Sequence, residues 1–261
     1  MTKLGVLDAP SPASTKPAIP EWLISDGAEP VTIQSTEIEA LNLLPPVPNP
    51  EKVICIGLNY RDHAIETGAE IPSEPVVFSK FNSTLIGHGS KIVLPTIAKQ
   101  VDYEAELVVI IGKTAKNVSK GNSLDYVFGY TCGHDVSARD WQKGRPGGQW
   151  LLGKTFDTFA PVGPIGVTAD EFGSPSDVNI MMRINGETMQ ASTTAQLIFD
   201  VPTLVSRLSA HMTLRPGDLI FTGTPSGVGA ARTPPRYLKA GDICEVEIKG
   251  IGTLKNLVVD E

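Results

Sequence analysis

The sequence carries little positive charge, few cysteines and no long hydrophobic run. Its 261 residues include 22 Lys and Arg against 29 Asp and Glu, which gives a net charge of -7. Proteins that bind nucleic acid neutralise phosphates with a basic surface, so this balance argues against nucleic acid as a partner. An anionic small molecule remains compatible with the composition, provided that a local group of cations binds it.

The three cysteines, Cys55, Cys132 and Cys244, are far apart and odd in number. They form neither a CxxC metal motif nor an evident disulfide framework. Two of them, Cys55 and Cys244, lie in apolar or strand-like runs. We therefore expect buried free thiols, which is typical of a reducing compartment.

No segment of the sequence is apolar enough to suggest a membrane partner. The longest apolar run, Leu107–Ile111, is far shorter than a membrane span. The N-terminal stretch has no apolar core of signal-peptide length. We expect a cytoplasmic protein, and import into an organelle by an atypical targeting peptide stays open.

Strand patterns dominate what the sequence does contain, and helical patterns are few. No regular alternation of strands and helices is present, which argues against a TIM barrel or a Rossmann sheet. Asn185-Gly186 predicts a hairpin with a type I′ turn. Pro161, Gly163 and Pro164 are expected to break the segment Phe159–Val167. The predicted class is α+β, rich in strands, with a few short helices. The expected strands are Val53–Gly57, Val76–Ser79, Lys91–Leu94, Tyr103–Ile111, Tyr126–Cys132, Asn179–Ile184, Leu219–Phe221, Ile243–Ile248 and Gly252–Val259, and the expected helices are Asn59–Gly68, Val136–Lys143 and Ile198–Leu208.

A proline-rich connector, LLPPVPNPEK, indicates a boundary near residue 50. Residues 1–50 then form a small N-terminal segment, and residues 51–261 form the main domain. Within the first segment, a short strand at Val31–Gln34 and a helix at Thr36–Leu41 are expected.

Two acidic residues, Glu104 and Glu106, stand two apart in an expected strand. Side chains at this spacing point to the same face, where two carboxylates repel unless solvent or a cation offsets their charge. A solvated strand face and a metal site both fit the pattern. The apolar run Leu107–Ile111 follows directly, so we place Glu106 at the edge of the core.

Further polar residues are spaced as if they shared a helix face. Asp135, Arg139 and Gln142 are four and then three apart, which fits an exposed ion-paired face or a third metal carboxylate followed by ligand-binding groups. Carboxylate ligands without His or Cys favour Mg²⁺, Mn²⁺ or Ca²⁺.

Three other features have both a structural and a functional interpretation. His63 and Glu66 are three apart and form either a surface pair or a base with its orienting carboxylate. Lys154 is either a surface lysine or a functional cation in apolar surroundings. The glycine-rich segment Thr222–Gly229 is either a plain turn or a loop whose N–H groups face an anion.

In their order along the chain, these segments resemble the fumarylacetoacetate hydrolase family, in particular its short bacterial and mitochondrial-type members. The resemblance covers about Val53 to Val259 and is specific through the combination, since no one motif is specific alone. It implies a mixed β-roll or β-sandwich with few short helices, and a homodimer. The motifs are GLNYRDHAIETG, EPVVFSK, VDYEAELVVIIGK, GHDVSARDWQ, GKTFDTFAPVGP, INGE, TGTPSGVG and GDICEVEIKGIGTLKN.

The resemblance also implies a role for each candidate residue. Glu104, Glu106 and Asp135 match the metal ligands of the family, for Mg²⁺ or Mn²⁺, with Ca²⁺ possible in crystals. His63 and Glu66 match a catalytic dyad on a mobile lid. The substrate-facing positions are matched by Arg139, Gln142 and Lys154, and more weakly by Lys80 and Thr224.

The reaction that this resemblance implies first is metal-dependent hydrolysis of a C–C bond in an acylpyruvate-type 2,4-dioxo acid, through a metal-bound enolate. His63 would activate water, and Lys154 would protonate the enolate or stabilise its charge. The alternatives on the same framework are an oxaloacetate tautomerase or decarboxylase and a hydroxymuconate-type isomerase. A catalytically inactive metal-binding protein is a further alternative, against which the intact His63–Glu66 pair argues.

The sequence departs from the family pattern at three places. His134 stands where many members have Asn, and Thr155 stands where Ser is common. The loop Gly144–Gly148 has a composition of its own. Because His134 and the loop adjoin the ligand set in sequence, we expect these differences to affect substrate choice rather than activity.

Overall fold

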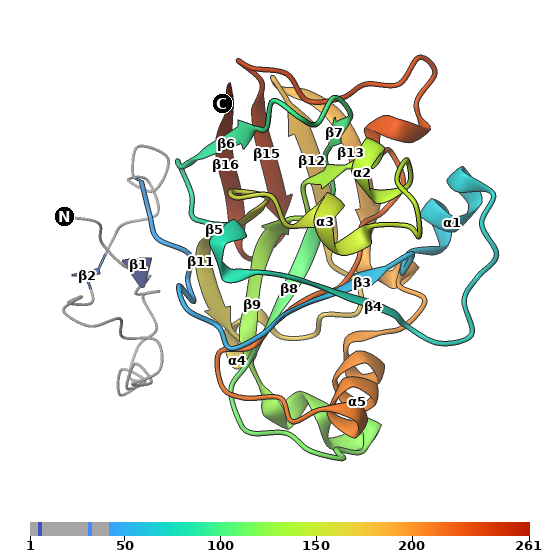
Figure 1. The fold of residues 1–261 in the computed structure, drawn as a ribbon. Helices are drawn as coiled ribbons and strands as arrows, with labels where there is room; N and C mark the ends of the chain where they lie inside the picture. The colour runs from blue at the N-terminus through green and yellow to red at the C-terminus, as the bar shows by residue number, and fades with distance from the viewer. Residues whose placement is uncertain (1–4, 7–30, 33–41) are drawn as a thin grey trace.

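A computed structural model describes residues 5–6, 31–32 and 42–261 (Figure 1). The helix expected at Thr36–Leu41 and most of the N-terminal segment lie outside the described residues, so the boundary near residue 50 stays a prediction. A short parallel pair joins β1 (Gly5–Val6) to β2 (Val31–Thr32), which is the first half of the strand expected there.

Two sheets form the body of the molecule. The larger has seven strands in the order β4-β3-β14-β8-β9-β11-β5, and the smaller has five in the order β13-β12-β15-β16-β6. The larger sheet contains β3 (Val53–Gly57), β4 (Val76–Lys80), β5 (Leu85–Ile86), β8 (Ala105–Ile111), β9 (Val127–His134), β11 (Ala160–Thr168) and β14 (Leu219–Phe221). The smaller sheet contains β6 (Lys91–Leu94), β12 (Asn179–Ile184), β13 (Glu187–Thr193), β15 (Ile243–Ile248) and β16 (Gly252–Asp260).

The remaining elements are short. A two-residue antiparallel pair joins β7 (Val101–Asp102) to β10 (Ser137–Ala138). The helices are α1 (Arg61–Thr67), α2 (Arg139–Gln142), α3 (Trp150–Lys154), α4 (Ala169–Phe172) and α5 (Val201–His211). Short 3₁₀ segments occupy Asn82–Thr84, Lys120–Tyr126, Thr194–Gln196 and Gly229–Ala231. The predicted strand-rich α+β class is confirmed.

Strand β8 lies at the centre of the larger sheet and is buried on both faces. Leu107 and Val109 belong to the main apolar core, whereas Val108 and Ile110 belong to a second cluster on the opposite face. Both faces are covered, which explains the uninterrupted apolar run in the sequence. Glu106 shares the face of Val108 near the start of the strand, so its carboxylate lies where the core ends.

Several local predictions are confirmed, because the signals for them are local. Helix α1 ends at Gly68 in the left-handed conformation, with φ of 63°. Asn185 and Gly186 have φ of 53° and 81°, as a type I′ turn requires. Helix α5 begins at Asp200, whose carboxylate accepts a hydrogen bond of 2.9 Å from the Thr203 N–H.

Two predictions about elements were wrong. The segment Val136–Lys143 is not one helix, because Ser137 and Ala138 pair with β7 and leave only Arg139–Gln142 helical. The segment Phe159–Val167 is not broken, because β11 continues across its prolines with a register shift between Gly163 and Val167. An irregularity of this kind lets a strand accommodate residues that cannot donate to the ladder.

The three cysteines are buried and free, as expected. Across the part of the chain that the structure describes, no helix is long and apolar enough to cross a membrane.

Candidate active site

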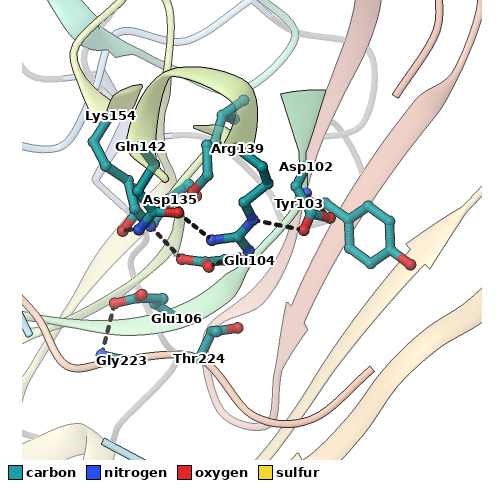
Figure 2. A network of polar contacts seen from close by, with 12 residues as sticks. Asp102, Tyr103, Glu104, Glu106, Asp135, Arg139, Gln142, Lys154, Gly223 and Thr224 are labelled. Carbon is teal, nitrogen blue, oxygen red and sulfur yellow. Dashed lines mark hydrogen bonds and ion pairs between the residues drawn. The ribbon is translucent and has the colours of Figure 1, made fainter. Parts of the chain in front are cut away.

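The site is built on three buried carboxylates that come from two neighbouring strands. Glu106 lies in β8, Glu104 precedes β8, and Asp135 directly follows β9. Antiparallel pairing of β8 with β9 sets Glu106 opposite Gly133, and the Asp135 N–H donates to the Glu104 carbonyl at 2.9 Å. One oxygen from each carboxylate lies within 4.8 Å of the others (Figure 2).

Two buried lysines neutralise part of this charge. Lys154, at the end of α3, donates to Glu104 Oε2 at 2.6 Å and to Asp135 Oδ2 at 2.8 Å. Lys80, at the end of β4, lies 2.7 Å from Asp135 Oδ1 and also donates to the carbonyls of Val136, Lys154 and Phe159. The cations that an anionic ligand requires are therefore gathered at one point of an acidic protein.

Arg139 connects the carboxylates to the expected substrate-binding amide. Its Nη2 donates to Glu104 Oε1 at 2.6 Å, and its Nη1 donates to Gln142 Oε1 at 2.9 Å. Its Nε donates to Asp102 Oδ2 at 2.8 Å. Because the acceptor oxygen of Gln142 is taken by Arg139, the amide group of Gln142 is left as a donor toward the cavity.

The two glutamates have opposite electrostatic environments. Burial raises the pKa of Glu104, but the adjacent Lys154 and Arg139 outweigh burial and hold this pKa well below its usual value. Burial, together with Asp135 and Glu104, raises the pKa of Glu106 well above its usual value. The Gly223 N–H donates to Glu106 Oε2 at 2.7 Å. These surroundings favour the neutral form of Glu106, and another cation in the cluster would favour its carboxylate form.

The predicted His63–Glu66 pair is formed on α1, across the cavity from the carboxylates. His63 Nδ1 lies 3.0 Å from Glu66 Oε2, and Glu66 Oε1 accepts the Gly227 N–H at 2.7 Å. Asp62, next to His63 in the helix, is bonded to Ser192 at 2.5 Å. Glu66 thus orients the imidazole and joins α1 to the glycine-rich loop at the same time.

Thr224 lies in the glycine-rich loop beside Glu106, with its hydroxyl already bonded on both sides. It donates to the Ala105 carbonyl at 2.9 Å and accepts from Gln190 Nε2 at 2.8 Å. Gln190 in turn accepts the Ala105 N–H at 2.9 Å. Thr224 and Gln190 therefore fasten the loop to the start of β8, and sequence reasoning missed Gln190 because it is distant along the chain.

These groups surround a cavity of about 270 Å³. Most of the predicted site residues line it, whereas Glu66 lies behind His63, and Lys80 lies beneath Asp135. The titratable side chains of the wall and its one amide are His63, Glu104, Glu106, Asp135, Arg139, Gln142, Lys143 and Lys154. The remainder consists of Ile56, Gly57, Leu58, Thr67, Ala69, Phe78, Trp150 and Thr224.

The residues that depart from the family pattern do not line this cavity. His134 is buried in β9 opposite Ala105, and burial with the nearby Lys80 lowers its pKa to about 3, so it is neutral at physiological pH. Thr155 accepts the Phe81 N–H at 3.0 Å. Any effect of these residues on substrate choice would therefore be indirect.

The donor set suits a divalent cation. Three buried carboxylates provide only oxygen ligands, which hard ions such as Mg²⁺, Mn²⁺ and Ca²⁺ prefer. With Asp102, the cluster has four acidic side chains against three cations, Lys80, Arg139 and Lys154. Burial, together with Asp135 and Glu104, raises the pKa of Glu106, and a cation beside Glu106 would lower this pKa.

Metal binding is therefore expected to release a proton. Because ligands bind in their deprotonated form, affinity for Mg²⁺ or Mn²⁺ should rise as pH rises through the pKa of Glu106 and should fall on acidification. Calorimetric titrations in two buffers of different ionisation enthalpy should report proton release when the ion binds. Equal apparent enthalpies in the two buffers would contradict this expectation.

A family model described as the fumarylacetoacetate hydrolase C-terminal domain matches residues 52–259. This match includes all three carboxylates, both lysines and the dyad. The chain belongs to the fumarylacetoacetate hydrolase family. It is accordingly an enzyme of a family whose members include isomerases and hydrolases.

Similar proteins show how the family varies. The mitochondrial oxaloacetate tautomerase fahd2 of Xenopus laevis is 49% identical over 219 residues, which is 84% of this chain and 69% of that protein. Two solved structures each cover 84% of this chain and share 42% identity with it over 78% of their own length. They are a 2-hydroxyhepta-2,4-diene-1,7-dioate isomerase from Mycobacterium marinum, with a TM-score of 0.74, and a fumarylacetoacetate hydrolase from Exiguobacterium antarcticum, with a TM-score of 0.77.

Proposed function

We propose that this family member is a divalent-metal-dependent oxaloacetate tautomerase, which interconverts the enol and keto forms of a small 2-oxo diacid. The observation that carries this choice is its likeness to the Xenopus tautomerase, at 49% identity over 84% of the chain. The sequence alone favoured C–C hydrolysis first, and the relatives support the tautomerase alternative better. A cavity of about 270 Å³ fits a small substrate, since sites for drug-sized ligands span roughly 300–1,000 Å³.

Tautomerisation moves one proton between the 2-oxygen and carbon 3 of the substrate. His63 is the base that we assign to carbon 3: Glu66 holds its Nδ1, which leaves Nε2 for proton transfer. A divalent cation held by Glu104, Glu106 and Asp135 would supply Lewis-acid stabilisation of the charge that develops on the 2-oxygen. Lys154, whose pKa is raised by Asp135 and Glu104 against the effect of burial, stays charged and adds to this stabilisation.

The substrate carboxylates need cationic partners, and the cavity provides three. Arg139 uses three N–H groups on Asp102, Glu104 and Gln142, so two of its five N–H groups are left for an anion. Lys154 lies beside the carboxylates, and Lys143 lies at the exposed end of α2. This arrangement suits a diacid, with one carboxylate bound deep in the cavity and the other near Lys143.

Hydrolysis of an acylpyruvate-type 2,4-dioxo acid is the second candidate. The observation that favours it is the apolar wall formed by Leu58, Phe78 and Trp150, which suits an acyl group better than a second carboxylate. In that reaction His63 would deprotonate water rather than carbon 3.

A substrate panel separates the two reactions. The enzyme with Mg²⁺ or Mn²⁺ would be given enol-oxaloacetate, acylpyruvates and hydroxymuconate-type diacids, with products followed by NMR. We expect the enol signal of oxaloacetate to decay to the keto form faster than in buffer, without loss of CO₂. Acceleration confined to acylpyruvate cleavage would replace the tautomerase with the hydrolase, and release of pyruvate from oxaloacetate would indicate a decarboxylase.

A homodimer and a cytoplasmic location stay predictions. Large apolar side chains are exposed on α1, β4 and α3 and just after β4, including Ile65, Val77, Phe81 and Leu152, and a dimer interface could cover some of them. The name of the Xenopus relative places that protein in mitochondria. Light scattering on the purified protein and fractionation of its cells would test the two predictions.

A further inference from the structure

Asp102 is a fully buried acid with no place in the chemistry described so far. It is the last residue of β7, two positions before Glu104. Its Oδ2 accepts the Arg139 Nε–H at 2.8 Å and the Ala230 N–H at 3.0 Å. Its Oδ1 accepts the N–H groups of Tyr103 at 2.8 Å and Gly229 at 2.7 Å. One carboxylate thus binds the site arginine and the end of the glycine-rich loop.

The bond to Nε matters because a guanidinium is rigid and planar. Once Nε is held by Asp102, the directions of Nη1 and Nη2 are set, and these atoms contact Gln142 and Glu104 (Figure 2). Asp102 itself does not line the cavity, whereas Arg139 does. Arg139 is therefore the direct contact through which Asp102 can act on a bound substrate.

The contact between Asp102 and the turn at residues 229–231 requires the backbone of that turn to come close to the carboxylate. At Gly229, an added Cβ would lie 2.5 Å from Asp102 Oδ1 and 1.9 Å from the Arg236 carbonyl oxygen. A residue with a side chain could not sit there without moving the turn. This glycine therefore lets the turn at residues 229–231 bring two N–H groups to Asp102.

We propose that Asp102 is a positioning residue for substrate binding. It sets the plane of Arg139 and connects Arg139 to the turn at the end of the glycine-rich loop. A substrate carboxylate then meets a guanidinium that is already oriented, which lowers the entropy lost on binding. The proposal rests on the proposed function in one respect, namely that Arg139 binds a substrate carboxylate.

The test is an Asp102→Asn variant in the metal-loaded protein. The amide nitrogen cannot accept, so up to half of the hydrogen bonds are lost and the charge beside Arg139 is removed. We expect the Kd of oxalate, a non-reacting dianion, to rise about tenfold, as for loss of one charge-assisted contact. KM for enol-oxaloacetate should rise by a similar factor, while kcat changes less than about threefold. The reason is that the lost interaction stabilises the bound substrate and the transition state equally.

Asp218→Asn is the matched control. Asp218 is also fully buried and lies away from the cavity. Its carboxylate accepts hydrogen bonds from the backbone N–H groups of Lys52 and Arg215 and from the Lys52 ammonium group. The Asp218→Asn variant should have a lower melting temperature and unchanged oxalate binding. Asp102→Glu, which keeps the charge but moves it, is the second variant if Asp102→Asn does not fold, and it should also weaken oxalate binding.

A double-mutant cycle separates positioning from a general loss of structure. In an Arg139→Lys background, Asp102→Asn should weaken oxalate binding no further, because the group that it orients is gone. Unchanged oxalate binding in a folded Asp102 variant, or an equal loss in both backgrounds, would overturn the proposal. If the wild-type protein binds oxalate but does not tautomerise oxaloacetate, the proposed function fails. The positioning role of Asp102 is then still tested by the Kd of oxalate.

Discussion

Glu106→Gln is expected to abolish divalent-metal binding and turnover together while leaving the metal-free fold intact. Burial and the neighbouring Asp135 and Glu104 raise the pKa of Glu106, which favours the neutral side chain in the metal-free protein. A glutamine has nearly the same shape and is also neutral. Its oxygen can still accept the Gly223 N–H that Glu106 accepts at 2.7 Å. The substitution therefore resembles the protonated acid, and removes only the ability to become an anionic ligand.

The expected magnitude follows from what the cation supplies. Lewis-acid stabilisation of developing charge is worth several kcal/mol, so turnover should fall by about a thousandfold or more. The melting temperature without metal should stay close to that of the wild-type protein, and the increase on adding Mg²⁺ or Mn²⁺ should disappear. Differential scanning fluorimetry with and without metal, together with the tautomerase assay, measures both effects.

Glu245→Gln serves as the control for loss of a glutamate. Glu245 lies in β15 of the smaller sheet, near Arg183 and Lys255, and is not part of the cavity wall. The Glu245→Gln variant should retain metal binding and turnover. Full activity of Glu106→Gln, or of the wild-type enzyme in excess EDTA, would contradict the metal-dependent mechanism.

The parts of the fold that the sequence predicted well are those with local signals. Strand β3, strand β14 and strand β15 begin and end where the apolar pattern does, and Gly68 ends α1 as expected. These features depend on residues within one turn or one strand, where side-chain period and glycine chemistry decide the conformation.

The error at Asp135 has a physical cause in pairing between distant segments. Asp135, Arg139 and Gln142 have helical spacing, and Arg139 and Gln142 do lie on α2. The backbone before them is extended because Ser137 pairs with Asp102, which lies 35 positions earlier in the chain. Periodicity within one segment cannot reveal such a pairing. The carboxylate nevertheless reaches the triad, because β9 carries it there.

Roles that depend on distant partners were also missed or left open. Lys80 was expected beside the substrate, but it bonds three carbonyls and contacts Asp135 beneath the cavity floor. Asp102 and Gln190 were not singled out at all. For Asp102 a signal was present: an acid two residues before Glu104, in a segment about to enter the core, needs a buried cationic partner.

His63→Ala is expected to keep metal binding and lose most of the catalytic rate. The imidazole is not among the three carboxylates of the metal cluster, so Mg²⁺ affinity should be unchanged. The hydrogen bond between α1 and the glycine-rich loop should also persist, because it joins Glu66 Oε1 to the Gly227 N–H and does not involve the imidazole. What disappears is the base, and removal of a positioned base typically costs about 10²–10⁴ in rate.

The measurement is kcat for enol-oxaloacetate beside calorimetric titration of Mg²⁺, with His211→Ala as the matched control. His211 is exposed at the end of α5, where its ring bonds the Arg207 carbonyl, and it does not line the cavity. Its loss should leave both quantities unchanged. If His63→Ala turned over normally, we would assign proton transfer to Lys154, which lines the cavity and bonds Glu104 and Asp135. The dyad would then serve only to hold α1 against the loop.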